Sequence, residues 1–103
     1  MLQSYKGHYP YNKETVSGWD SNAIGVYYCG YPNGGGLDVL YVGRATNYGG
    51  IRTRLLQHLA EDQWRDVSHF GYCVCTTSEE AENFEASEIR RLQPRYNKQG
   101  KFN

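Results

Sequence analysis

Residues 23–43 read A-I-G-V-Y-Y-C-G-Y-P-N-G-G-G-L-D-V-L-Y-V-G. Over 23–30 the side chains alternate between two faces, with Tyr27 on one and Tyr28 on the other, which predicts a strand. The cluster Y-P-N-G-G-G is typical of a turn. Residues 38–43, D-V-L-Y-V-G, are predicted to form a second strand. This stretch therefore predicts a β-hairpin with a longish loop, and it fixes the start of the sheet.

The rest of the chain adds two helices and one strand. Apolar residues at helical spacing predict a helix over 51–60, and 68–76 read as a third strand. Thr77 and Glu80 have the spacing of a capping box, which opens the last helix. Pro94 ends that helix, because the residue before a proline avoids helical geometry. The predicted order is β-β-α-β-α.

We therefore expect a small α+β domain over 23–103, with a three-stranded, mainly antiparallel sheet flanked by helices. Residues 1–22 are polar and aromatic without a clear period. They are interpreted as an irregular N-terminal extension with one short helix.

Composition bounds the class of protein. The chain has 103 residues and a net charge of zero, which argues against a generally basic nucleic-acid binder. No segment is apolar enough to span a membrane or to act as a secretory signal. Three cysteines cannot all pair, so we expect reduced thiols and a cytoplasmic location.

Charge is unevenly distributed along the chain. Basic residues gather in 44–54 and 87–103, and acidic residues in 61–66 and 79–88. This segregation indicates either a basic face for a nucleic-acid backbone or acids and bases placed at opposite helix ends. For the first reading the candidate DNA-binding residues are Arg44, Arg52, Arg90, Arg91, Arg95 and Lys98.

Glu85 is the exception in the last helix. It falls on the same stripe as Ala81, Ile89 and Leu92, which are apolar. A carboxylate is a poor choice for an apolar face. Glu85 is therefore either a salt-bridge partner at the edge of the stripe or a functional residue.

Five short segments then agree in order and type. They are G-V-Y at 25–27, Y-V-G at 41–43, R-L-L-Q-H at 54–58, Glu85, and Q-P-R-Y-N at 93–97. Taken together they resemble the GIY-YIG nuclease family, in particular the catalytic domain of the nuclease subunit of bacterial nucleotide excision repair. The resemblance runs from Gly25 to Asn97.

The resemblance implies a role for each matching residue. Glu85 would hold one Mg²⁺ (or Mn²⁺), and Arg54 would contact the scissile phosphate, with Arg52 as its competitor. The other implied catalytic residues are Tyr27, Tyr41, His58 and Asn97. A nearby cation and the metal would lower the pKa of Tyr27 and make it a base for water.

The leading expectation is a metal-dependent endonuclease acting on DNA. A single carboxylate suits a one-metal mechanism, since two-metal sites need clustered acids. The alternative is a non-catalytic nucleic-acid-binding module on the same scaffold. A protein-interaction domain would explain the ten tyrosines but not Glu85. Target choice is left to the N-terminal extension, a homodimer or a partner protein.

His69, Cys73 and Cys75 also raise the question of zinc. The two cysteines alternate on a predicted strand and share a face, but a fourth ligand is not evident. We therefore favour buried structural thiols.

Overall fold

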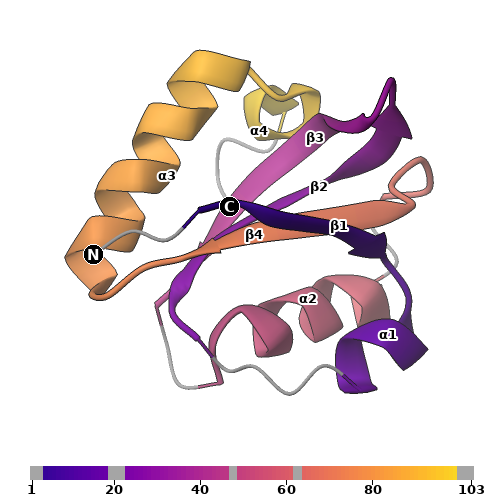
Figure 1. Cartoon of the computed structure of the whole chain (residues 1–103), viewed down its shortest axis with the longest axis horizontal. Coiled ribbons are helices and arrows are strands. Elements are labelled where there is room, and N and C mark those ends of the chain that lie inside the picture. Colours follow the sequence, from indigo (N-terminus) through magenta and orange to yellow (C-terminus); the bar gives the residue numbers. More distant parts are fainter. Residues whose placement is uncertain (1–3, 19–22, 47–48, 62–63, 100–103) are drawn as a thin grey trace.

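A computed structural model describes residues 4–18, 23–46, 49–61 and 64–99. It confirms a small α+β domain (Figure 1). Over the described residues the elements are, in order, β1 (Lys6–Pro10), α1 (Lys13–Gly18), β2 (Gly25–Asn33), β3 (Gly36–Ala45), α2 (Gly50–Glu61), β4 (His69–Val74), α3 (Ser78–Leu92) and α4 (Arg95–Gln99).

The sheet has four strands in the order β1-β4-β2-β3, and every pair is antiparallel. The expectation of three strands is wrong, because part of the supposed N-terminal extension joins the sheet as a fourth strand. Lys6 lies opposite Tyr72, and Pro10 lies opposite His69. The short helix expected in the same segment is α1. The N-terminal segment is therefore part of the packed domain.

The hairpin is tighter than expected. Asn33 pairs with Gly36, so only Gly34 and Gly35 form the turn. Both have positive φ, +59° and +86°, a region that glycine enters without steric cost. Two-residue turns of this kind match the twist of paired strands. The other residues of the predicted turn cluster belong to the strands, with 31–33 in β2 and Gly36 in β3.

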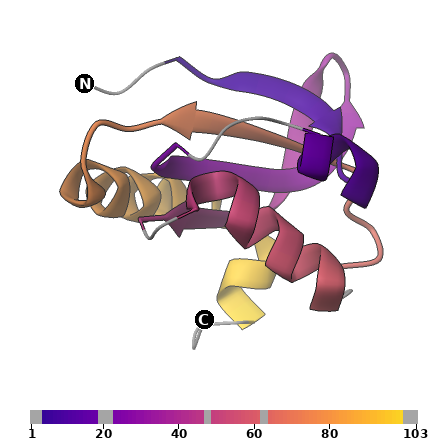
Figure 2. The ribbon, with the colours of Figure 1, turned by 90° about the horizontal axis from the view of Figure 1, so that it is seen from below.

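Both faces of the sheet are covered, as the alternation over 23–30 predicts. Tyr27 packs in one cluster with Val16 of α1 and with Leu55 of α2. Val26 and Tyr28 pack in the other cluster, against α3. Figure 1 shows α1 and α2 together beneath the sheet and α3 along its other side, and Figure 2 shows α1 beside α2.

Helix α3 begins as predicted. The Thr77 side chain accepts a hydrogen bond from the Glu80 backbone N–H at 3.1 Å. It ends at Gln93, which takes the left-handed conformation. Pro94 follows, and the chain then forms α4, which was not predicted. Among the described residues, no helix has both the length and the apolar character needed to cross a bilayer.

Candidate active site

Tyr27 and His58 form a buried polar pair on the α2 side of the sheet. The Tyr27 hydroxyl lies 2.9 Å from His58 Nε2. The two residues are 0% and 7% exposed. Tyr27 lies opposite Gly43, where an added Cβ would come within 2.5 Å of the Tyr27 hydroxyl. The Tyr27 ring therefore fits here because position 43 is a glycine.

Tyr41 and Trp64 complete an aromatic cluster around His58. The Trp64 ring lies 4.6 Å from that of Tyr41 and 4.5 Å from that of His58, measured between centroids. The Tyr27 and Tyr41 rings are 6.2 Å apart. The structure thus brings together three of the predicted site residues, and Trp64 fixes two of them by packing.

Arg54 lies one helical turn before His58 on α2. Its guanidinium donates to Gln57 Oε1 at 2.9 Å. It is also close enough to Tyr27 to lower the pKa of that phenol, but burial raises the pKa by more. The expected cation is thus in place, but burial outweighs it and the net shift of the Tyr27 pKa is upward; the effect of a bound metal stays a prediction. Tyr27 is a neutral phenol at physiological pH.

Glu85 lies on α3, on the opposite face of the sheet, and pairs with Arg44 of β3. Arg44 Nη1 and Glu85 Oε1 are 2.6 Å apart, and the two side chains are 45% and 15% exposed. Arg44 is thus a cation that compensates the charge of Glu85. The hydrogen bond to Glu85 raises the pKa of Arg44, and the Tyr41 phenol adds a smaller effect in the same direction.

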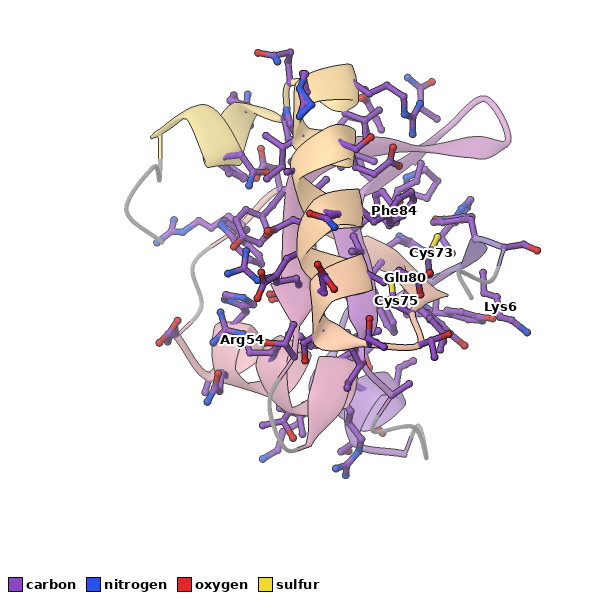
Figure 3. The ribbon with its side chains drawn as sticks, turned by 90° about the vertical axis from the view of Figure 1, so that its left-hand side faces the viewer. Lys6, Arg54, Cys73, Cys75, Glu80 and Phe84 are labelled. Carbon is purple, nitrogen blue, oxygen red and sulfur yellow. The ribbon has the colours of Figure 1, made fainter. Side chains whose placement is uncertain are left out.

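The edge position of β3 brings the two groups of residues together. Tyr41 belongs to the α2 side and Arg44 to the α3 side, yet the two are close enough to interact electrostatically. Tyr41 also adjoins Tyr27, which interacts with Arg54. Figure 3 shows Arg54, on α2, on the side of the molecule away from Phe84 and Cys73. Tyr41 therefore lies between the Tyr27–His58 pair on one face of the sheet and the Arg44–Glu85 pair on the other.

Asn97 has a structural position. Its Oδ1 accepts from the Val42 N–H at 2.7 Å, and its Nδ2 donates to the Val42 carbonyl at 2.9 Å. Both hydrogen bonds tie α4 to the outer edge of β3.

Part of the predicted DNA-binding patch at the end of α3 is engaged elsewhere. Arg91 donates two hydrogen bonds to Glu88, and Arg95 pairs with Asp66. Arg90 is exposed. Arg91 and Arg95 are thus paired with acids of this chain, while their side chains are 64% and 55% exposed.

Arg52 and Lys98 are the remaining predicted DNA contacts. Arg52 donates to the Ser17 carbonyl at 2.9 Å and so joins α2 to α1. This leaves Arg54 as the α2 arginine beside the Tyr27 pair. The Lys98 side chain lies outside the described residues.

A metal site must be judged on Glu85. The described residues hold no group of three or more histidine, cysteine or acidic side chains placed to bind one ion. Mg²⁺, however, often takes one or two carboxylates and completes its shell with water and phosphate. Glu85 already faces a cationic group, Arg44, at 2.6 Å. Its surroundings therefore fit a cation, provided that Arg44 moves away.

The zinc alternative turns on the thiols. Cys29, Cys73 and Cys75 are free and buried. Cys73 and Cys75 share the cluster beneath α3, as their alternation predicts. Burial raises the pKa of all three thiols, which keeps them protonated. They have the environment of structural thiols.

Glu88 is the residue that the sequence analysis missed. It is 6% exposed, more buried than Glu85 on the residue scale, and accepts a hydrogen bond from the Tyr28 hydroxyl at 2.7 Å. Its position seven residues after Ala81 places it on the inner stripe of α3. That spacing was the available signal.

No family model, curated protein or solved structure was found to match this chain. The resemblance to the GIY-YIG nucleases therefore stays a prediction, carried by the residues described above.

Proposed function

We propose that the protein is a metal-dependent endonuclease that hydrolyses phosphodiester bonds in DNA by a one-metal mechanism. The observation that carries the proposal is the position of Tyr41 in the edge strand β3, close to a polar group on each face of the sheet. The Tyr27–His58 pair, with Arg54 close to Tyr27, adjoins Tyr41 on one face. On the other face, Tyr41 interacts electrostatically with Arg44 of the Arg44–Glu85 pair. Cations, a carboxylate and a phenol are the groups that phosphoryl chemistry uses.

Arg54 and Arg44 are assigned to the substrate phosphate. A guanidinium presents a planar fork that matches phosphate oxygens. Arg44 is 45% exposed and can turn toward a ligand without unpacking the core. A phosphate at this edge would compete with Glu85 for Arg44, so substrate binding would free the Glu85 carboxylate.

Glu85 is assigned to the metal. Bound there, Mg²⁺ would neutralise charge on the phosphoryl oxygens and lower the pKa of a water. The carboxylate is mostly shielded from solvent, at 15% exposure, which strengthens its attraction for a cation.

Tyr27 and His58 are assigned to holding the site. The Tyr27 hydroxyl is closed off from solvent, and its raised pKa keeps the proton on oxygen. We assign the phenol as the donor to His58 Nε2, the arrangement in which the other ring nitrogen carries the N–H. If the Tyr27 oxygen takes a proton during the reaction, the hydroxyl proton of Tyr27 passes to His58 Nε2.

The test is a cleavage screen with purified protein. Duplex, single-stranded and branched DNA, together with RNA, are incubated with Mg²⁺, with Mn²⁺ or with a chelator. We expect metal-dependent cleavage of DNA, essentially none with Glu85→Gln, and a loss of about a hundredfold or more in kcat with Arg54→Ala. Glu79→Gln, an exposed acid in the first turn of α3, is the matched control.

Folding of the test variant must be secured separately. Glu85→Gln loses the ion pair with Arg44, and because the Arg44 side chain is 45% exposed, the pair contributes only about 0–1 kcal/mol. The variant should therefore fold and still bind DNA. A folded, fully active Glu85→Gln protein would end the mechanism. DNA binding without cleavage by the wild type would instead indicate a binding module.

A further inference from the structure

A second site lies on the other side of α3. A cavity of about 470 Å³ opens between this helix and the sheet. Its lining comes from α3, from β2, β3 and β4, and from the segment before β1. Figure 3 shows Phe84 and Cys73, two of the lining residues, on the side of α3 away from Arg54. The cavity is therefore separate from the candidate active site.

The walls are mostly apolar. Leu37, Val39, Phe84 and Leu92 line the cavity and are only partly buried. Tyr5 also lines the cavity. Its ring packs edge-to-face with the ring of Tyr28, with centroids 5.4 Å apart. Apolar and aromatic walls around a few polar groups are typical of small-molecule sites, and the volume lies within their usual range of about 300–1,000 Å³.

Glu88 is the polar group that gives this cavity direction. It lines the cavity although it is 6% exposed. Glu88 Oε1 accepts from the Tyr28 hydroxyl at 2.7 Å and from Arg91 Nη2 at 2.8 Å, and Oε2 accepts from Arg91 Nε at 2.8 Å. A carboxylate has about four acceptor positions. Three are filled, so one more donor can be accepted.

The charge balance selects the kind of donor. Arg91 pairs with Glu88 through two hydrogen bonds and neutralises its charge. A cationic ligand would gain little from a carboxylate that is already compensated, and it would lose its own hydration. A neutral N–H loses less on burial and still gains a charge-assisted hydrogen bond. The aromatic lining favours a flat partner.

We propose that this cavity binds a small, flat, neutral heteroaromatic molecule whose ring N–H donates to Glu88. The site is independent of the proposed nuclease activity.

The test uses indole as the probe and 1-methylindole as its matched control, which has the same ring but no N–H. Both are titrated into the isotope-labelled full chain, and backbone amide shifts are followed by NMR. Indole should give saturable shifts at residues 37–39 and 84–92, and it should bind about tenfold more tightly than 1-methylindole, as expected for a hydrogen bond to a charged acceptor. In Glu88→Gln, whose folding is checked by its melting curve, the difference between the probes should shrink.

The comparison of the two probes on the wild type needs no variant to fold. Equal affinities would overturn the assigned role of Glu88. Shifts that do not saturate, or that fall on other residues, would overturn the site. A stronger preference for tryptamine, the cationic relative of indole, would overturn the choice of a neutral ligand.

Discussion

Replacing Asn97 with alanine tests whether this side chain holds α4 against β3 or takes part in catalysis. Its amide makes two hydrogen bonds to Val42, at 2.7 and 2.9 Å. Val42 is fully buried and belongs to the edge strand β3. The alanine variant would leave the Val42 N–H and carbonyl without these partners, and α4 without its polar tie to the sheet.

The cost follows from the two bonds. Each contributes about 0.5–1.5 kcal/mol net, so their loss should lower the free energy of unfolding by about 2 kcal/mol. For a domain of this size each kcal/mol moves Tm by about 4–8 °C, which gives a fall of about 8–16 °C. Asn97→Asp should cost at least as much, because it keeps an acceptor for the Val42 N–H but sets a carboxylate oxygen against the Val42 carbonyl.

Thermal and urea unfolding, followed by circular dichroism, measure these changes. Asn83→Ala, at an exposed position of α3, is the control and should stay near the wild type. Cleavage is measured well below the melting temperature of every variant. If Asn97→Ala melts within about 2 °C of the wild type, the reasoning from the hydrogen bonds is refuted. If it also loses cleavage, Asn97 is catalytic as the family resemblance implies.

Three further predictions follow from the same geometry. Gly43→Ala places a Cβ within 2.5 Å of the buried Tyr27 ring and should destabilise the fold by about 1–3 kcal/mol, measured by urea unfolding. The hydrogen bonds from Arg91 are the main reason why the pKa of Glu88 is lowered. The stability that Glu88 contributes is therefore present above its unfolded pKa of about 4.3 and is lost as the pH falls through the folded value. The difference in urea midpoint between the wild type and Glu88→Gln should shrink between about pH 5 and pH 3. Arg44→Gln removes the competitor for Glu85 and should raise the affinity for Mn²⁺ severalfold by electron paramagnetic resonance, and an unchanged affinity would contradict the assignment of Glu85 to the metal.

Local signals were enough to predict most elements of the fold. The alternation around Tyr27 and the Thr77 capping box act within a few residues, and both appear in the structure. Strand β1 was missed because it is formed by long-range pairing with β4, while its own side chains are mostly exposed and show no alternation. Helix α4 was missed because it is only one turn long and its tie to the sheet, Asn97, acts across the fold.

The candidate site divides in the same way. The spacing of Arg54 and His58 on one helix is a local feature, and both lie beside Tyr27. The Arg44–Glu85 pair depends on which face of β3 meets α3. Strand alternation could have supplied that answer, because Arg44 must face away from Tyr41 and Gly43.

The register of the hairpin also shows what the G-V-Y and Y-V-G segments can support. Tyr27 of the first lies directly opposite Gly43 of the second, and a Cβ at 43 would collide with its ring. A Cβ at Gly25 would come within 2.2 Å of the Cys73 carbonyl in the neighbouring strand. Both glycines therefore have a packing reason that holds whether or not the protein cleaves DNA. The two segments are evidence for this hairpin and its buried phenol. The case for phosphoryl chemistry rests on Arg54 and Glu85, and because Glu85 also has a structural partner in Arg44, the cleavage assay of Glu85→Gln decides between its two roles.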